Sequence, residues 1–365
     1  MVKKIFLIIV SIYSIIKINY FIKKNKKIIF FYHPSPNLGN ITSYYIELVF
    51  EKLKKKYQVL YGYQNSSLKK NKKYNYFYIK ENLLKYISLK NFFVSTYICN
   101  NFPKNCFKIY IHHDIYDTPI VSKNLINNLK NRLEKYDTVL IPTDDSKKKF
   151  LKIISKKTKI KFHNIGYIKL DILNELKQKL KYKKKKNIII APTNIYSFRN
   201  FTIFENLDFI IKKILQKTNY NIILRPHPSN FNDIRFQKLA NNFNTNSRFF
   251  YDRSDNYLKI YLESYLMITD LSGTAYTYAF LTNNPVIFFI ENSNLIKKYN
   301  YDKLSYFKDI KKIGNLSNKK NFNKVLKNTE KNHLFFKNKI IKLKNQKIPE
   351  LGKSIKKFDQ ILSSI

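Results

Sequence analysis

The sequence has no tryptophan, two methionines, two cysteines and six glycines in 365 residues. The two thiols, Cys99 and Cys106, are too few for a disulfide framework or a four-cysteine zinc site, and they fit a reducing compartment. Acidic residues are also scarce, with 24 of them against 69 lysines and arginines. A hydrophobic fraction of 44% nevertheless excludes a largely disordered chain. The length permits two domains, each with its own core.

The formal net charge of +45 would ordinarily indicate a polyanionic partner. The lysines are scattered along the chain, however, and they accompany an excess of Asn, Ile, Tyr and Phe. Drift toward A/T-rich codons produces such a composition. We therefore predict no nucleic-acid partner, whereas the charge favours an anionic membrane surface and anionic substrates.

Residues 5–22 form an apolar stretch with lysines on both sides, more densely on the C-terminal side. Its length is close to the ~20 residues of a spanning helix, but a central lysine, Lys17, opposes insertion by ~2.5–3.5 kcal/mol. We predict that residues 1–26 are a membrane-associating segment, either an anchor or a monotopic helix. The lysine distribution predicts the cytoplasmic side of the cell membrane. The alternative is a buried N-terminal element.

After this segment, strand-length apolar runs alternate with helical segments, which is typical of a parallel α/β sheet with helices on both faces. The basic run LKYKKKKN at 180–187 interrupts the alternation. We therefore predict two doubly wound, Rossmann-type domains, residues 27–180 and 187–345, that face each other across a cleft. A final helix at 346–365 is expected to cross back onto the first domain.

Strands are expected at 27–34, at 187–193 and in the further runs that begin near 57, 92, 107, 137, 161, 220, 248, 265 and 285. Helices are expected near 41–56, 122–136, 144–157, 201–218, 232–243, 255–264 and 274–281, and after 321. The Asn/Lys-rich patches at 69–75 and 315–325 are expected to be solvated loops.

The stretch MITDLSGTAYTYAFLTNNPVIFF at 267–289 predicts a strand, a turn, a helix and a second strand. In parallel sheets, ligands bind at the turn that follows the carboxyl end of a strand. Ser272, Gly273 and Thr274 would offer N–H groups and hydroxyls at a helix start, which suits a phosphate. The alternative is an ordinary βαβ unit, in which Asp270 and Ser272 only cap the helix.

Arg225 and His227 lie in LRPHP, at the carboxyl end of another apolar run. The two prolines end the strand and stiffen the turn. A guanidinium and an imidazole suit a pyrophosphate, so these residues are a second phosphate-binding candidate. The alternative is that they cap neighbouring carbonyl groups.

IHHDIYDTP, at 111–119, provides the candidate base for the first domain. An imidazole beside a carboxylate can deprotonate a hydroxyl, so His112, His113 and Asp114 are the candidate catalytic residues. His33, which ends the first strand, could line the same cleft. Adjacent histidines on a strand point in opposite directions, so no metal site is predicted, although a divalent cation is left open. The alternative is a structural histidine pair.

Three motifs of the second half resemble the CDP-glycerol glycerophosphotransferase family of teichoic-acid and capsule polymerases. They are APT, which ends at Thr193, then RPHP, and ITDLSGTAYTYAFLTNNPVIFF at 268–289. GYIKLD at 166–171 is similar to the family's Gly-x-Pro-x-x-Asp element, and IHHDIYDTP resembles its His-Gly-x-Pro motif. The resemblance covers roughly 107–290 and implies a GT-B fold.

The resemblance also implies roles for individual residues. His113 would be the base that activates the acceptor, with His112 as the fallback. Arg225 and His227 would bind the donor's phosphates, and Ser272–Thr274 its pyrophosphate. The chain departs from the family pattern at three positions. Asp114 replaces a glycine, Gly273 replaces a second serine, and Thr277 replaces an acidic residue.

Together these features predict a transferase that moves a polyol phosphate from a CDP-polyol to a hydroxyl of a membrane-linked glycan or polyol-phosphate acceptor. No cofactor is predicted. One alternative is a GT-B glycosyltransferase that uses a nucleotide sugar. A second is a non-enzymatic basic protein that binds membranes or nucleic acid.

Overall fold

The computed structural model describes residues 2–24, 27–34, 48–64, 75–112, 114–116, 129–155, 158–183, 185–196, 199–254 and 257–365. The chain divides into two compact units. The N-terminal unit comprises Met1–His113, Pro119–Ile172 and Glu350–Ile365, and the C-terminal unit comprises Asp114–Thr118 and Leu173–Pro349.

The N-terminal unit contains a seven-stranded parallel sheet in the order β3-β2-β1-β4-β5-β6-β7. Its strands are β1 (Ile28–His33), β2 (Gln58–Tyr63), β3 (Asn75–Tyr78), β4 (Phe92–Ser95), β5 (Phe107–Ile111), β6 (Thr138–Ile141) and β7 (Lys161–Asn164). All six residues of β1 are buried, as expected for a strand covered on both faces.

The C-terminal unit contains a six-stranded parallel sheet in the order β10-β9-β8-β11-β12-β13. Its strands are β8 (Asn187–Ile190), β9 (Asn221–Leu224), β10 (Phe249–Tyr251), β11 (Ser264–Thr269), β12 (Val286–Phe289) and β13 (Gly314–Ser317). Counted from its first strand, each sheet runs 3-2-1-4-5-6, which is the doubly wound order, and the N-terminal sheet adds a seventh strand at the end. Ligands of such sheets bind where the order reverses, which in this unit lies between β8 and β11.

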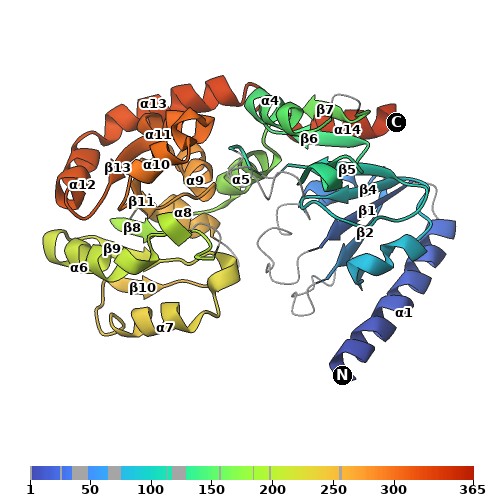
Figure 1. Ribbon diagram of the computed structural model, residues 1–365, viewed down its shortest axis with the longest axis horizontal. Coiled ribbons are helices and arrows are strands. Elements are labelled where there is room, and N and C mark those ends of the chain that lie inside the picture. The colour runs from blue at the N-terminus through green and yellow to red at the C-terminus, as the bar shows by residue number, and fades with distance from the viewer. Residues whose placement is uncertain are drawn as a thin grey trace. The chain divides into compact units, whose positions relative to one another are not determined.

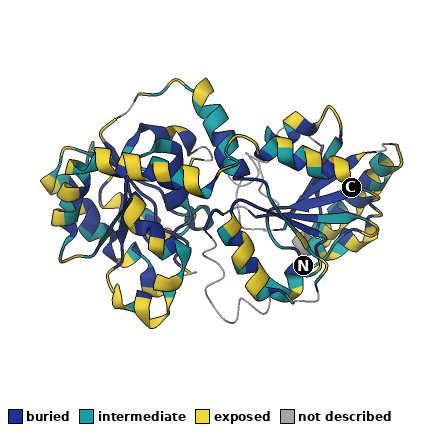
Figure 2. Ribbon diagram, turned by 90° about the horizontal axis from the view of Figure 1, so that it is seen from above, coloured by how far each residue is buried: buried dark blue, intermediate teal, exposed yellow. Residues whose placement is uncertain are grey.

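Helices cover the faces of both sheets, and the strands form the buried interior while the outer turns of the helices are exposed (Figures 1 and 2). The helices named in Figure 1 are α1 (Val2–Lys24), α4 (Asp144–Ile153), α5 (Ile168–Lys179), α6 (Leu207–Lys217), α7 (Ile234–Asn241), α8 (Leu258–Glu263), α9 (Thr274–Thr282), α10 (Asn294–Lys298), α11 (Ser305–Ile313), α12 (Phe322–Lys331), α13 (His333–Lys347) and α14 (Ser354–Ser364). α9 is buried along most of its length.

The predicted α/β alternation is confirmed, but two strands lie where loops were expected. β3 begins at Asn75, at the end of the first Asn/Lys-rich patch, and β13 covers Gly314–Ser317 at the start of the second. Both are short edge strands next to polar sequence, so hydrophobic periodicity gives little signal for either. Pairing with β2 and β12 defines them instead.

The N-terminal apolar stretch is the helix α1, and it is long and apolar enough to cross a membrane. One face nevertheless packs on the N-terminal unit, where Ile15 and Ile18 are buried in a core cluster with β1 and β3 residues. The Ser11 hydroxyl accepts the Lys80 N–H at 3.2 Å. The opposite face exposes large side chains: Ile5, Phe6, Ile8, Ile9, Ile12, Tyr13, Ile16 and Tyr20.

The GYIKLD motif holds the C-terminal helix α14 on the N-terminal unit. The Asp171 carboxylate accepts the N–H groups of Gly352 at 2.7 Å and Ser354 at 3.1 Å, just before and at the start of that helix. Gly166 has φ +81°, and a Cβ atom built on it would lie 2.9 Å from the Glu350 carbonyl oxygen. The glycine and the aspartate therefore both serve the docking of the chain's last segment.

Candidate functional site

The carboxyl ends of the C-terminal unit's strands bring polar residues from distant parts of the sequence to one sheet edge. In sheet order, the residues after these ends are Asp252 (β10), Arg225 (β9), Thr193 (β8) and Asp270 (β11). Two of the neighbouring pairs are hydrogen-bonded: Arg225 donates to Asp252, and the Thr193 N–H donates to Asp270. These bonds fix the turns on which the candidate site is built.

Asp270 joins three turns at the point where the strand order reverses. It is fully buried, and its two oxygens accept the N–H of Thr193 at 2.9 Å and the N–H of Ile203 at 3.0 Å. Burial raises the pKa of Asp270 to about 6, although the two N–H donors act in the opposite direction. Asp270 thus anchors the turn, and both of its oxygens are engaged by the protein.

The turn Ser272–Thr274 leads directly into α9. The Ser272 carbonyl accepts the Ala275 N–H at 3.2 Å and the Tyr306 hydroxyl at 3.1 Å. The Thr274 hydroxyl is bonded to the Tyr261 hydroxyl. Gly273 and Thr274 are half-buried, so the amino end of the helix is not covered by the core. The combination of helix dipole, N–H groups and hydroxyls suits a phosphate.

Arg225 is buried, and its contacts are with the protein. Its guanidinium pairs with Asp252 and donates to the Ser254 carbonyl at 2.8 Å. The same group lies 5.4 Å from the Phe231 ring centroid and 5.8 Å from that of Tyr257. In this structure Arg225 therefore orders the turn after β10, and its predicted direct contact with a donor phosphate stays a prediction.

His227 is held in one ring orientation by its own turn. Nδ1 accepts the Ser229 N–H at 3.2 Å, so the neutral ring carries its proton on Nε2. The Nε2–H is then a hydrogen-bond donor on a side chain that is only half-buried. This arrangement is compatible with the predicted phosphate contact.

The predicted acceptor-side motif is divided between the two units. His112 belongs to the N-terminal unit, whereas Asp114 and Tyr116 belong to the C-terminal unit. His113, the predicted base, lies outside the described residues. Asp114 lies against the turn Ser272–Thr274, because a Cβ atom built at Gly273 would be 2.9 Å from Asp114 Oδ1.

The two other histidines predicted for the first domain, His112 and His33, are buried in the N-terminal unit. His112 packs edge-on against Phe150 of α4, with ring centroids 5.0 Å apart, and its Nδ1 lies 3.2 Å from the Tyr110 hydroxyl. His33 ends β1 and packs against the ring of Tyr97 at 4.9 Å. His33 is the last residue of β1 and His112 follows β5, as predicted, but His112 packs into the core against α4.

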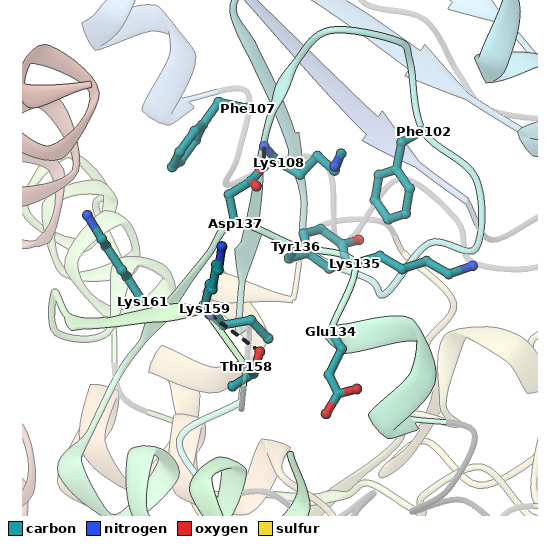
Figure 3. A pocket seen from close by; sticks show the side chains of 11 residues that line it. Phe102, Phe107, Lys108, Glu134, Lys135, Tyr136, Asp137, Thr158, Lys159 and Lys161 are labelled. Atoms are coloured by element: carbon teal, nitrogen blue, oxygen red, sulfur yellow. Dashed lines mark hydrogen bonds between the residues drawn. The ribbon is translucent and has the colours of Figure 1, made fainter. Parts of the chain in front are cut away.

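A cavity of about 570 Å³ lies at the opposite, amino edge of the N-terminal sheet, at the starts of β5, β6 and β7 (Figure 3). Its wall combines aromatic rings with four lysines: Lys108, Lys135, Lys159 and Lys161. Its two acidic residues, Glu134 and Asp137, each accept a backbone N–H. Ligands of parallel sheets bind at the carboxyl edge, so we do not assign this cavity to the reaction.

A metal site needs several close ligands. Within the described residues, no group of three or more His, Cys, Asp or Glu side chains is arranged to hold a metal ion. Cys99 and Cys106 are free thiols, and burial raises the pKa of both to about 12. They are therefore poor nucleophiles and poor metal ligands at neutral pH.

Two parallel α/β sheets of doubly wound order, with a phosphate-suited turn at the carboxyl edge of the second, define a GT-B-like fold. A family model described as CDP-Glycerol:Poly(glycerophosphate) glycerophosphotransferase matches residues 12–348. The chain therefore belongs to this family, and it is an enzyme of the glycerophosphotransferase type. Membership implies a CDP-glycerol donor and a poly(glycerophosphate) acceptor. It thereby favours the polyol-phosphate transferase over the nucleotide-sugar glycosyltransferase and over the non-enzymatic basic protein.

Solved structures support the fold. The chain is similar to the wall teichoic acid polymerase TagF, with 18% identity, coverage of 100% of this chain and 98% of that chain, and a TM-score of 0.63. Anabaena HepE in complex with UDP and glucose matches at 12% identity over 93% of this chain and 100% of that chain, with a TM-score of 0.52. UDP-GlcNAc 2-epimerase from Methanocaldococcus jannaschii matches at 14% identity with the same coverage and TM-score. No curated protein sequence matches the chain significantly.

Proposed function

We propose that the turn Ser272–Thr274 holds the diphosphate of CDP-glycerol while an acceptor hydroxyl attacks its β-phosphorus. The observation that carries this proposal is the turn itself, which lies at the reversal of strand order and is fixed by Asp270 and Tyr306. Its N–H groups and hydroxyls stand at the amino end of α9, where a negative charge is favoured. Charge that gathers on the phosphoryl oxygens during transfer would meet donors already in position.

In the proposed step, a bond forms between the acceptor oxygen and the β-phosphorus. The bond from that phosphorus to the bridging oxygen breaks, and CMP leaves. The acceptor's proton passes to His113, a role that rests on the family resemblance. His227 is assigned to the phosphates, because its Nδ1 accepts a backbone N–H and its Nε2–H is the donor.

Arg225 is assigned a positioning role in this proposal. Its bonds to Asp252 and Ser254 join the turns after β9 and β10, and His227 follows it two residues later. Removing the guanidinium would then disturb His227 through the backbone, without loss of a direct contact to the donor.

We further propose that α1 lies in the plane of an anionic membrane on its cytoplasmic side. A spanning helix needs lipid around its whole circumference, whereas Ser11, Ile15 and Ile18 are engaged by the N-terminal unit. The exposed apolar face carries two cation–π pairs, Lys17 over Tyr13 at 4.6 Å and Lys24 over Tyr20 at 4.4 Å. Apolar residues with such aromatic and basic neighbours are typical of interfacial helices. Membrane attachment would bring the enzyme to a membrane-linked acceptor.

The test is transfer of labelled glycerol phosphate from CDP-glycerol to a poly(glycerophosphate) acceptor, with release of one CMP per transfer. His113→Ala should abolish kcat and leave donor binding intact, whereas His227→Ala should raise the donor KM. His163→Gln, on the strand β7, serves as the histidine control. Turnover of a nucleotide sugar but not of CDP-glycerol would contradict the proposal.

A further inference from the structure

The carboxylate of Asp114 occupies the space that a side chain at position 273 would need. A Cβ atom built at Gly273 would lie 2.9 Å from Asp114 Oδ1 and 3.4 Å from its Cγ. The first distance is shorter than real Cβ atoms tolerate, so a larger residue at 273 would displace the carboxylate. The Asp114 carboxylate and the missing side chain of Gly273, in the turn Ser272–Thr274, are therefore complementary in shape.

Asp114 is fixed to the C-terminal unit by the residue two positions later. Tyr116 is buried, its hydroxyl donates to Asp309 at 2.7 Å, and its ring centroid lies 4.0 Å from that of Tyr276 on α9. Lys312 and Lys347 in turn pair with Asp309, at 2.7 and 3.2 Å. A buried, neutralised anchor of this kind holds Asp114 in place, so the carboxylate is a standing part of the turn's surroundings.

A carboxylate beside a phosphate-binding turn repels the phosphate. The position of Asp114 therefore indicates which part of the donor it could contact. The other carboxylate of the turn, Asp270, is buried with both oxygens bonded to N–H groups. Asp114 is only half-buried, and it lies against Gly273, the residue before the first turn of α9. A part of the donor that this carboxylate attracts must therefore be an uncharged group that is attached to the phosphate.

We propose that Asp114 is a specificity-determining residue that recognises the polyol of the donor. This inference rests on the proposed function, in which the β-phosphate lies at Ser272–Thr274. The glycerol is esterified to that phosphate and keeps two free hydroxyls within a few bonds of it. An ionised carboxylate only accepts hydrogen bonds, so its two oxygens match two O–H donors. Asp114 accepts hydrogen bonds from these hydroxyls, and the repulsion of the diphosphate is offset only when a polyol is present.

The test compares a ligand that has the polyol with one that lacks it. Without the polyol, the terminal phosphate of CDP also carries more negative charge, which Asp114 repels more strongly. Calorimetry gives the Kd of CDP-glycerol and of CDP for the wild type, Asp114→Asn and Asp114→Ala, with excess EDTA and again with Mg²⁺. We expect both substitutions to weaken CDP-glycerol binding at least 10-fold in either condition, while CDP binds equally well or more tightly. Asp302→Asn removes an exposed carboxylate of the same unit, and should change neither Kd.

Three results would overturn the inference. A parallel loss for both ligands would mean that Asp114 only supports the turn, and unchanged Kd values would mean that it contacts neither ligand. An effect seen only with Mg²⁺ would mean that the carboxylate binds a cation. If the wild type binds CDP but not CDP-glycerol, the proposed function fails together with the inference.

The pairing with Gly273 gives an independent check. Gly273→Ala should weaken CDP-glycerol binding, because its Cβ displaces the Asp114 carboxylate. In the Asp114→Ala background the same substitution should have a much smaller effect, since the obstructing oxygen is gone. Equal effects in both backgrounds would contradict the geometry on which the inference is built, and thermal unfolding of each variant confirms that it is folded.

Discussion

Arg225 and Asp252 form an ion pair across the ends of two neighbouring parallel strands, β9 and β10. Their side chains are only 6% and 14% exposed, so the pair is largely shielded from water. Removal of one partner from a buried pair leaves an uncompensated charge, which destabilises a protein by about 3–5 kcal/mol. We expect Asp252→Asn to lower the free energy of unfolding by an amount of this order and to raise the donor KM.

Chemical denaturation checks this prediction against an exposed pair. Asp208 and Lys212 are 47% and 58% exposed, and Asp208→Asn should change the free energy of unfolding by less than about 1 kcal/mol. If Asp252→Asn is as mild as this control, Arg225 is not held by the pair and its direct contact with the donor becomes the better assignment.

The second prediction concerns the pH dependence that Asp270 contributes. Burial raises its pKa to about 6, whereas an unfolded aspartate has its ordinary pKa of 3.8. Between these values the folded state binds more protons than the unfolded state, so this contribution to stability falls as the pH rises from about 4 to about 6. The free energy of unfolding of the wild type minus that of Asp270→Asn should therefore shrink over this range. A difference that grows with pH would show that the two N–H bonds outweigh burial.

The third prediction concerns the docking of α14. Asp171→Ala removes the acceptor of the Gly352 and Ser354 N–H groups and should destabilise the helix by about 1–3 kcal/mol. Hydrogen exchange should then accelerate in Ser354–Ser364 and remain unchanged in the C-terminal unit. Asp208→Asn, which breaks the exposed pair with Lys212 far from α14 in the sequence, is the control. Retained protection of α14 in Asp171→Ala would contradict the anchoring role.

The fourth prediction separates the two faces of α1. Ile12 and Ile16 are 50% and 63% exposed, so Ile12→Gln with Ile16→Gln should leave the thermal unfolding temperature unchanged and weaken binding to anionic vesicles. Ile18 is fully buried, and Ile18→Ala should lower the free energy of unfolding by about 2–5 kcal/mol. Vesicle sedimentation measures membrane binding, and thermal unfolding measures stability, so the two effects are distinguished. Undiminished sedimentation of the double variant would rule out the exposed face as the membrane contact.

The fifth prediction concerns the lysine-lined cavity of Figure 3. Lys159 lies just before β7 and Lys161 begins it, at the amino edge of the N-terminal sheet. Lys159→Gln with Lys161→Gln should leave kcat and the donor KM unchanged. A loss of transfer by the folded double variant would assign this cavity a part in the reaction.

The sequence by itself determined the class of fold and the sheet edge at which the candidate site lies. Apolar runs of strand length alternate with helical segments, and both properties depend on residues close together in the chain. The motifs RPHP and ITDLSG each follow such a run, so the parallel arrangement brings them to one edge. The edge strands β3 and β13 were not predicted, because their short, polar sequences become strands only through pairing with a neighbour.

Only the tertiary structure decided what the site residues contact. Arg225 meets Asp252 from another strand, Asp270 receives N–H groups from Thr193 and Ile203, and Tyr306 supports Ser272. These partners lie between 27 and 77 residues away in the chain, and no local pattern encodes them.

The contact between Asp114 and Gly273 depends most on the tertiary structure. The sequence marked both positions as departures from the family pattern but gave no reason to connect them. Folding brings together two residues that are 159 positions apart, so that the carboxylate of one fills the space left by the missing side chain of the other. Side-chain volume and burial are properties of the packed chain, and this is why the pairing could be recognised only in the structure.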